Sequence, residues 1–430
     1  MRVLVKTYGC PANSADSQAI VGCLLRAGYD LARSEQDADV VVFNTCAVKG
    51  PTEDRVISDL RRVLPGKKVV VAGCLPLVSF DRLKNMVRFD GVIGPVSGSV
   101  VVDVVKRVVD GEKVELLTTS EAAPKLELPR VRSSSVVSIV PVASGCLGSC
   151  AYCCVVFARG RLRSCAVAGV ADLVRRDLAC GAREFWVTAQ DMGCYGNDLG
   201  TSLAELLHAL SGVEGDFKVR VGMMTPNTVK NDLRNVIDAF GNKKIFKFAH
   251  LPVQSGNDKV LRLMRRFYSV GDFEEIVRSF RRAFPEITIA TDVICGFPGE
   301  TLEDFDDTLR LIERVRSDVV NISKFFARPG TAASKMRDDF VGFREIKRRA
   351  TIAAQLVKKI SLENNERWVG WEGEILIDEK GKVPGSWVGR NFAYRPVAVK
   401  SKEKLLGETV KVKVVEAFPT YLAGEIFCFE

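Results

Sequence analysis

Three cysteines have a spacing that suits an iron–sulfur cluster. The segment GCLGSCAYCC contains four cysteines within nine positions and directly follows the apolar, β-branched segment VVSIVPVAS. Cys146, Cys150 and Cys153 are spaced C-x-x-x-C-x-x-C. A short loop of this kind can bring three thiolates to one cubane cluster and leave the fourth iron open to a cofactor. We exclude Cys154 from the set, because its use would discard the pair formed by Tyr152 and Cys153.

Other uses of cysteine fit the sequence less well. The chain has 13 cysteines in 430 residues, and its first residues, MRVLVKTYGC, lack the apolar block of an export signal. A disulfide framework is therefore not expected. Only two histidines, His208 and His250, are present, which disfavours imidazole-based zinc sites and histidine acid–base catalysis. We assign no role to the remaining cysteines, Cys23, Cys165, Cys180, Cys194, Cys295 and Cys428.

Three more cysteines each follow a predicted strand. Cys10 comes after RVLVKTYG, Cys46 after VVVFNT and Cys74 after VVVAG. Successive members lie about 30 residues apart, the length of one strand–helix–strand unit. The carboxyl ends of parallel strands meet at one edge of a sheet, where such folds bind ligands. We therefore predict a second cluster on these three thiolates, again with one open iron.

The elements that must position both sets divide this α/β chain into three parts. Strands alternate with helical patterns in residues 1–112, which predicts a doubly wound parallel sheet. A linker rich in proline and serine follows at 113–135. Six strands alternate with helices in 136–366 and predict a partial TIM-like barrel, with the first cysteine set after its first strand. Short alternating strands predict a small all-β barrel over 367–430.

Composition narrows the class of protein. Apolar residues make up 47% and charged residues 27%, as in soluble globular proteins. No apolar run is long enough to span a membrane, so we expect a cytoplasmic protein with no membrane partner. The net charge is +9, and basic residues cluster in RLMRRFYSV, RSFRRAF and REIKRRATIAAQLVKKI. Such clusters favour RNA as a partner, although ordinary surface charge explains them equally well.

The first cysteine motif resembles that of the radical S-adenosylmethionine (SAM) superfamily, which carries this spacing after the first strand of a partial barrel. The resemblance implies that the open iron binds the amino and carboxylate groups of SAM. It also implies that an electron from the cluster cleaves SAM to a 5′-deoxyadenosyl radical.

With both sets in view, the whole chain resembles the methylthiotransferases. Their amino-terminal domain is similar to TYGCPANSADSQ, NTCAV and GCLP, and their radical domain to GCLGSCAYCCVVFARGRLRS, TAQDMGCYGND, HLPVQSGNDKVLRLMRR, TDVICGFPGET and FARPGTAASKM. The final segment resembles their RNA-binding TRAM barrel. The segments GCLGSCAYC and FARGRLRS are closest to the archaeal and eukaryotic type, which acts on N6-threonylcarbamoyladenosine (t6A) at tRNA position 37. Bacterial members usually have CIVP where this chain has CCVV.

The resemblance implies two [4Fe–4S] clusters, SAM and a tRNA anticodon loop as substrate. The cluster on Cys10, Cys46 and Cys74 would carry sulfur that one SAM methylates. A second SAM, cleaved at the other cluster, would supply the radical that removes hydrogen from C2 of the adenine, and the carbon radical would take the methylthio group. We also expect an electron donor protein and a monomeric enzyme, with no catalytic side chain beyond the cluster ligands.

Further candidates lie at strand ends of the predicted barrel. We predict SAM contacts at eight positions, and for Gln190 and Asp191 the resemblance implies them: Tyr152, Gln190, Asp191, His250, Gln254, Ser255, Gly296 and Glu300. Structural roles compete with this prediction, namely turn chemistry for the glycine and a structural hydrogen bond for the lone histidine. Lys324 and Arg328, at the last strand, are predicted to bind a phosphate or carboxylate of the substrate.

Two other functions remain open. A methylthiotransferase that modifies an aspartate of a ribosomal protein would fit the same motifs, because such a target is also embedded in RNA. An RNA-binding protein with structural or redox-sensing clusters would not cleave SAM. Zinc in place of iron would favour this second alternative, since sulfur-only ligation also suits zinc.

Overall fold

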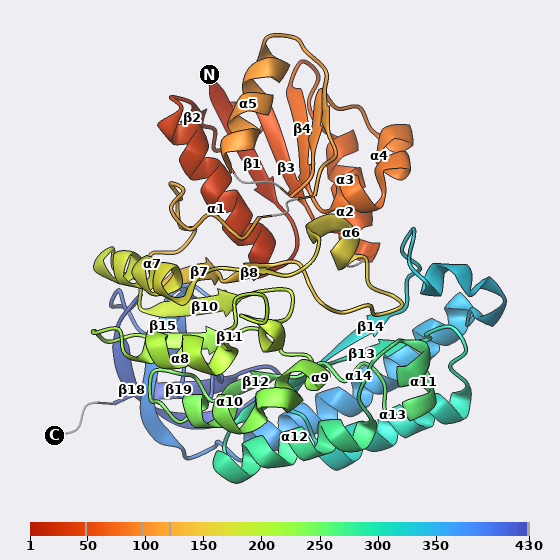
Figure 1. Cartoon of the computed structure of the whole chain (residues 1–430). Helices are drawn as coiled ribbons and strands as arrows, with labels where there is room; N and C mark the ends of the chain where they lie inside the picture. The colour runs from red at the N-terminus through yellow and green to blue at the C-terminus, as the bar shows by residue number, and fades with distance from the viewer. Residues whose placement is uncertain (48–49, 96–97, 120–121, 428–430) are drawn as a thin grey trace.

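The computed structural model describes residues 1–47, 50–95, 98–119 and 122–427, which form three units (Figure 1). The amino-terminal unit is a parallel sheet in the order β2-β1-β3-β4-β5-β6. Its strands are β1 (Arg2–Thr7), β2 (Asp30–Leu31), β3 (Val40–Thr45), β4 (Lys68–Gly73), β5 (Gly91–Ile93) and β6 (Val114–Leu116). The central strands are β-branched and buried on both faces, as expected for a parallel sheet between two helical layers.

Helices cover both faces of this sheet. One face packs against α1 (Pro11–Arg26) and α5 (Gly98–Val109). The other packs against α2 (Gly50–Arg61), α3 (Leu75–Val78) and α4 (Phe80–Met86). The predicted doubly wound sheet is therefore confirmed.

The central unit is a half-barrel of six parallel strands in two sheets, β7-β10-β11 and β12-β13-β14. A parallel bridge between Val219 and Ile245 links the two sheets. The strands are β7 (Val137–Pro141), β10 (Glu184–Thr188), β11 (Lys218–Val221), β12 (Phe248–His250), β13 (Thr288–Cys295) and β14 (Val319–Lys324). Within the described residues no pairing joins β7 to β14, so the barrel is open on that side, as predicted.

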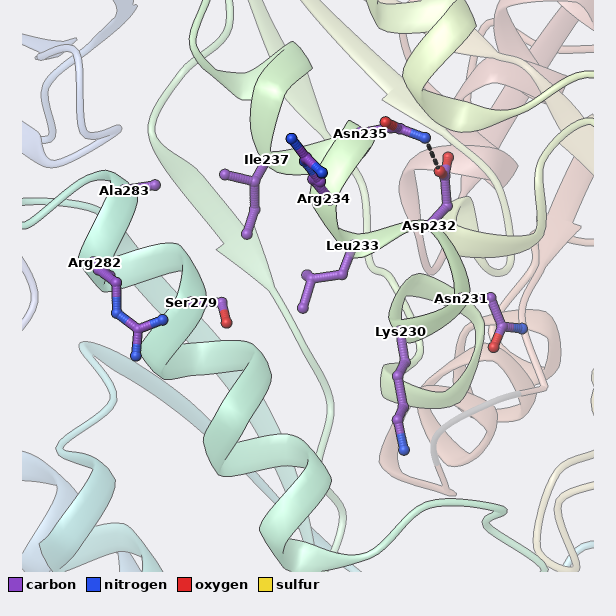
Figure 2. Close-up of a pocket in the computed structure, with 10 residues that line it drawn as sticks. All are labelled: Lys230, Asn231, Asp232, Leu233, Arg234, Asn235, Ile237, Ser279, Arg282 and Ala283. Atoms are coloured by element: carbon purple, nitrogen blue, oxygen red, sulfur yellow. Dashed lines mark hydrogen bonds between the residues drawn. The ribbon is translucent and has the colours of Figure 1, made fainter.

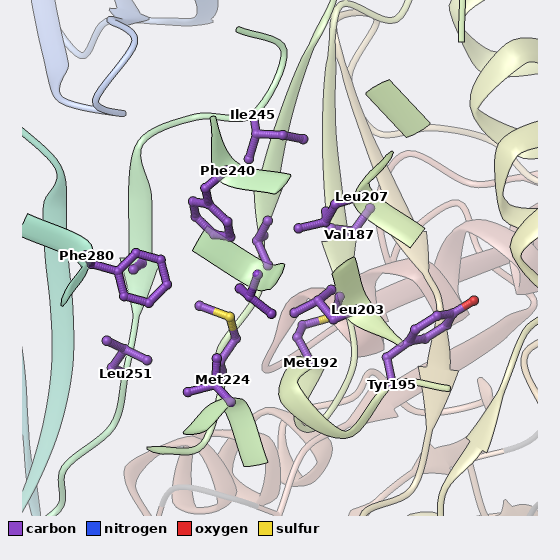
Figure 3. Packing of buried hydrophobic residues seen from close by; sticks show 14 of the residues in the cluster. Val187, Met192, Tyr195, Leu203, Leu207, Met224, Phe240, Ile245, Leu251 and Phe280 are labelled. Carbon is purple, nitrogen blue, oxygen red and sulfur yellow. The ribbon is translucent and has the colours of Figure 1, made fainter. Parts of the chain in front are cut away.

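Helices wrap the outside of the half-barrel. They are α7 (Val167–Ala179), α8 (Leu203–Ser211), α9 (Pro226–Val229), α10 (Leu233–Phe240), α11 (Asp258–Leu263), α12 (Val270–Ala283), α13 (Leu302–Val315) and α14 (Phe343–Glu366). Their apolar faces form the main core with the strands, and Figure 3 shows Phe240 and Phe280 meeting edge to face, 5.4 Å apart between ring centroids. None of the helices in the described ranges is long and apolar enough to cross a membrane.

A loop with little regular structure joins the first barrel strand to the outer helices. It contains the hairpin strands β8 (Ala143–Ser144) and β9 (Arg163–Ser164), with the short helix α6 (Val155–Arg159) between them. Figure 1 shows α6 between the amino-terminal sheet and the half-barrel. We call this contact zone the junction.

The carboxy-terminal unit is a closed barrel in the order β15-β16-β17-β19-β18. Its strands are β15 (Glu372–Lys380), β16 (Ser386–Arg390), β17 (Pro396–Lys400), β18 (Thr409–Ala417) and β19 (Leu422–Ile426). It packs against the amino ends of the half-barrel strands: Lys247 N, just before β12, donates to Phe392 O at 2.8 Å, and Arg395 pairs with Asp318, just before β14. It therefore lies at the opposite end of the half-barrel from the first cysteine set.

Candidate functional site

The sulfur atoms of the first cysteine set all accept N–H hydrogen bonds. The donors are Gly148 N to Cys146 at 3.2 Å, Arg266 Nη1 to Cys150 at 3.4 Å, and Val155 N to Cys153 at 3.5 Å. Donors aimed at sulfur stabilise thiolates rather than thiols. The loop is therefore arranged for three negatively charged sulfur ligands.

Arg266 is the charged member of these donors and is itself buried. Its guanidinium also donates to Pro252 O at 2.9 Å and to the Tyr268 hydroxyl at 3.1 Å, so its position is fixed. Burial raises the pKa of Cys146 to about 11, although the charge of Arg266 opposes this effect. A buried thiol of this kind becomes a thiolate when it binds a metal, because the metal supplies the missing positive charge.

Cys154 has a different environment from its neighbours. Its side chain is buried, and Sγ donates to Ala47 O of the amino-terminal unit at 3.6 Å. Burial raises its pKa to about 11. This sulfur acts as a thiol donor toward the amino-terminal unit, whereas the sulfur atoms of Cys146, Cys150 and Cys153 accept N–H hydrogen bonds.

The second set lies at the carboxyl edge of the amino-terminal sheet. Thr45 and Gly73 are register partners at the ends of β3 and β4, so Cys46 and Cys74 follow neighbouring strands. Gly9 has φ = +109°, and a Cβ there would lie 2.3 Å from Cβ of Cys46. Only glycine allows Cys10 to approach this closely. Cys46 and Cys74 are buried, whereas Cys10 is exposed.

Asn13 connects the members of this set and was not among the predicted residues. Its Nδ2 donates to Tyr8 O at 2.9 Å and to Thr45 O at 2.8 Å, which ties the ends of β1 and β3 together. Its Oδ1 lies 3.9 Å from Sγ of Cys74. The signal in the sequence was an amide three residues after Cys10, in the first turn of a helix that begins with Pro11.

Arg159, at the end of α6, brings a positive charge to the second set. Its Nη2 donates to Asn13 Oδ1 at 2.7 Å and to Asp16 at 2.6 Å, and the side chain is buried. Burial raises the pKa of Cys74 to about 12, and the nearby charge of Arg159 opposes that rise. Each cysteine set thus has one buried arginine beside it, and sequence reasoning missed both.

The donor chemistry of both sets fits an iron–sulfur cluster. Each set offers three cysteine sulfurs at a loop or sheet edge with one buried guanidinium nearby, and the first set also has two backbone N–H donors. Among the described residues, no group of three or more His, Cys, Asp or Glu side chains is placed to hold a single metal ion. A cubane places each cysteine on a different iron, so its ligands need not converge on one point.

Gln190 and Asp191, after β10, differ in what their side chains do. The Asp191 carboxylate accepts from Gly193 N at 3.0 Å, Thr225 N at 2.9 Å and Thr228 Oγ1 at 3.0 Å. It therefore holds two loops together. Gln190 Oε1 is buried without a hydrogen-bond partner in the described part of the chain, which makes it available to a ligand.

His250 and Asp292 form a polar chain on neighbouring strands. His250 Nε2 lies 2.8 Å from Asp292 Oδ2, and Asn321 Nδ2 donates to Asp292 Oδ1 at 2.8 Å. Both side chains of the first pair are mostly buried. His250 on β12 is thus part of a hydrogen-bonded chain that continues to Asp292 on β13 and Asn321 on β14.

Four other predicted SAM contacts lie in the loops that follow β12 and β13. Gln254 has φ = +71° and forms an isolated parallel β-bridge with Val293 of β13. The Ser255 hydroxyl oxygen lies 3.4 Å from the hydroxyl oxygen of Thr308. Glu300 accepts from Gly296 N and from the buried Arg349, both at 2.7 Å. The side chains of Ser255 and Glu300 are therefore occupied by the protein itself.

The remaining predicted residues lie toward the junction or on the surface. The Tyr152 ring packs edge to face on Phe297, with centroids 6.4 Å apart. Lys324 is exposed, with Nζ 5.8 Å from the Phe343 ring centroid. Arg328 is buried and pairs with Glu53 of α2. Cys428 lies outside the described residues.

A surface pocket lies apart from all these residues. Figure 2 shows it between α10 and α12 on the outside of the half-barrel. Its lining includes Lys230, Arg234 and Arg282, and it contains no residue of the predicted site. We assign it no part in the site.

Comparison with known proteins assigns each unit. Residues 2–94 match the model of the uncharacterized protein family UPF0004, residues 140–312 the radical SAM superfamily, and residues 366–427 the TRAM domain. The central unit is therefore a radical SAM domain, a class that uses an iron–sulfur cluster and SAM. The radical SAM methyltransferase TsrM from Kitasatospora setae has a similar fold, with a TM-score of 0.55, 14% identity, and coverage of 93% of this chain and 80% of that chain.

Relatives over the full length identify the family. A protein of Pyrococcus horikoshii named "Probable threonylcarbamoyladenosine tRNA methylthiotransferase" is 39% identical, with 99% of both chains covered. The threonylcarbamoyladenosine tRNA methylthiotransferase of Drosophila melanogaster is 37% identical, with 99% of this chain and 77% of that protein covered. This chain belongs to the family of threonylcarbamoyladenosine tRNA methylthiotransferases, and the resemblance found in the sequence is confirmed.

Proposed function

We propose that this protein transfers a methylthio group to C2 of t6A at position 37 of tRNA. One observation carries the proposal: Cys154 Sγ donates to Ala47 O at 3.6 Å, which joins the neighbour of Cys153 to the neighbour of Cys46. Two cysteine sets, each able to leave one iron open, therefore meet at the junction. The activity named for the relatives supports the choice of substrate.

The cofactors proposed are two [4Fe–4S] clusters and SAM. When bound, they would supply reductive cleavage of SAM at the half-barrel and sulfur for transfer at the amino-terminal sheet. The ligands proposed are Cys146, Cys150 and Cys153 for the first cluster and Cys10, Cys46 and Cys74 for the second. The chain contributes buried cations beside the thiolates and holds the loops that carry them.

Among the proposed SAM contacts, Gln190 has the strongest support, because its buried Oε1 lacks a partner in the described residues and can accept from the amino group of SAM. Ser255, Gly296 and Glu300 would act through the shape of the loops that contain them. Tyr152, Asp191, His250 and Gln254 also remain proposed contacts. Lys324 and Arg328 are proposed to bind the substrate.

We further propose that the anticodon loop of tRNA reaches the junction and that an electron donor protein reduces the half-barrel cluster. The protein would act as a monomer in the cytoplasm, with its domains at 1–112, 136–366 and 367–430. The open side of the half-barrel supports access for a large substrate.

The test is nucleoside mass spectrometry of tRNA after incubation with anaerobically reconstituted protein, SAM and a reductant. We expect t6A to gain a methylthio group, and tRNA with unmodified adenosine-37 to stay unchanged. The variant C46A should abolish the product but still release 5′-deoxyadenosine. Unmodified tRNA together with a methylthiolated ribosomal protein would overturn the choice of substrate, and no cleavage of SAM would overturn the enzymatic class.

A further inference from the structure

Arg328 is a buried arginine, and two of its three guanidinium nitrogens have no hydrogen-bond partner among the described residues. It follows β14 in the segment FARPGT and is only 2% exposed. Its Nη1 donates to Oε2 of Glu53 on α2 of the amino-terminal unit. Its Nε and Nη2 are buried and have no hydrogen-bond partner among the described residues. Buried N–H groups are almost always paired in native proteins, so these two call for a ligand.

The ion pairs around Arg328 involve two guanidinium groups and two carboxylates. Glu53 is 1% exposed and is shared with a second arginine, Arg82, whose Nη1 lies 2.7 Å from Oε1. Nη2 of Arg82 lies 2.6 Å from Oδ1 of the exposed Asp54. Glu53 thus faces two guanidinium groups, and Asp54 balances the charge of the second one. Nε and Nη2 of Arg328 still lack an acceptor among the described residues, and this unpaired edge favours an anion.

The free edge has a shape that selects particular anions. Nε–H and an Nη2–H of one guanidinium point in parallel and match two oxygens of a carboxylate or a phosphate. Glu53 occupies Nη1 only, so it fixes the group and leaves this fork open. The fixed fork therefore fits an oxyanion better than a neutral group.

Arg328 lies at the junction between the two cysteine sets. The charges of Arg328 and Glu53 both act on Cys154, which follows Cys153 directly. The guanidinium lies over the ring of Phe326 at 4.8 Å, and Phe326 is 46% exposed. A Cβ at Gly50, the first residue of α2, would lie 3.0 Å from that ring. A partly exposed aromatic side chain thus lies against the guanidinium at the junction.

We propose that the Nε–Nη2 edge of Arg328 binds one oxyanion of the substrate RNA beside the reacting nucleotide, and that Glu53 is the positioning residue for this edge. The proposal rests on the proposed function and adds the subsite to it. The oxyanion is either the carboxylate of the threonylcarbamoyl group or a backbone phosphate of the anticodon loop. The two sources share the same fork-to-oxyanion chemistry.

The experiment measures fluorescence anisotropy of a labelled anticodon stem-loop RNA with the iron-loaded full chain. One RNA carries t6A at position 37 and the other an unmodified adenosine. We expect R328K to weaken binding about tenfold or more, because lysine can keep the ion pair to Glu53 but cannot form the fork. If R328K loses affinity for the t6A RNA alone, the oxyanion is the carboxylate. If it loses affinity equally for both RNAs, the oxyanion is a phosphate.

Arg82 supplies the matched control, because it pairs with the same carboxylate from the other side. R82Q should leave the affinity for both RNAs within about twofold. E53Q should raise KM for the RNA and leave kcat at saturating RNA nearly unchanged, which a purely structural role would not do. Unchanged affinity of R328K for both RNAs would overturn the proposal, even if wild-type protein methylthiolates t6A. If R328K weakens RNA binding but the wild-type protein does not methylthiolate t6A, the subsite stands and the proposed function is wrong.

Discussion

Nη2 of Arg159 lies 2.7 Å from Oδ1 of Asn13, so the last residue of α6 is fixed to the first turn of α1. The same nitrogen lies 2.6 Å from a carboxylate oxygen of Asp16. Asn13 in turn contacts Cys74, whose Sγ is 3.9 Å from Oδ1. A buried guanidinium from the cysteine loop of the half-barrel therefore helps to hold the second cysteine set in place.

Replacement of Arg159 by alanine is expected to lower the free energy of unfolding by about 3 kcal/mol, because Asp16 and Asn13 lose a buried charged partner. R159K should recover part of this loss through its charge. The exposed Arg161 provides a control: R161A should change stability by less than about 0.5 kcal/mol. Urea unfolding of the iron-loaded proteins under anaerobic conditions measures both effects. Equal losses for R159A and R161A would contradict a role for this contact.

Cys153 and Cys154 offer a matched pair of adjacent thiols. C153A should lose about half of the bound iron, because one of two cubanes would lack a ligand. C154A should keep both clusters and lose about 1 kcal/mol of stability, because it removes a small buried group and one weak hydrogen bond to Ala47. Iron analysis and the visible absorption spectrum distinguish the two variants. A C154A protein that lost a cluster would show that the ligand set is wrong.

The sequence was enough to predict the strands, the helices and the cysteine sets, because these follow from short stretches of the chain. Cys10, Cys46 and Cys74 could be assigned to one sheet edge because each ends a strand, and parallel register then brings the ends of β3 and β4 together. The spacing of the first set likewise lies within one loop. Strand alternation was enough to predict all three units, since the pattern of β-branched runs is also local.

Contacts between distant segments could not be predicted. Asn13 and Arg159 are 146 residues apart, and Glu53 and Arg328 are 275 residues apart. Their pairing depends on how the amino-terminal unit packs on the half-barrel. The hydrophobic periodicity of the sequence carries no information about that packing. The same limit applies to Glu300, since its partner Arg349 lies on a helix 49 residues away.

Gln190 and Asp191 should separate SAM binding from stability. Q190A is expected to weaken SAM binding about tenfold, because the buried Oε1 is free to accept from the ligand. D191A should instead lower the free energy of unfolding by about 2 kcal/mol, because it removes a helix cap and leaves Thr225 N without its acceptor. Equilibrium dialysis with labelled SAM and thermal unfolding measure these effects. The reverse pattern would assign the SAM contact to Asp191.

Glu184 gives the contact between the half-barrel and the carboxy-terminal barrel a pH dependence. Burial, and then the nearby charge of Asp378, raise the pKa of Glu184 to about 7. Burial also raises the pKa of Asp378, and Arg390 opposes that rise. The folded protein therefore holds a proton that the unfolded chain, with an ordinary pKa of 4.5, has already released. The contribution of Glu184 to the free energy of unfolding is complete below pH 4.5, the ordinary pKa, and is lost as the pH rises through about 7.

We expect the free energy of unfolding to fall by up to about 1.4 kcal/mol per pH unit across this window, from the Glu184 proton alone. E184Q keeps an acceptor for Trp186 and carries no charge, so it should flatten the slope and be more stable than wild type near pH 8. E374Q, at an exposed position of β15, should leave the slope unchanged. Urea unfolding at several pH values measures the three slopes. An E184Q slope equal to that of wild type would show that the buried carboxylate stays ionised in the folded protein.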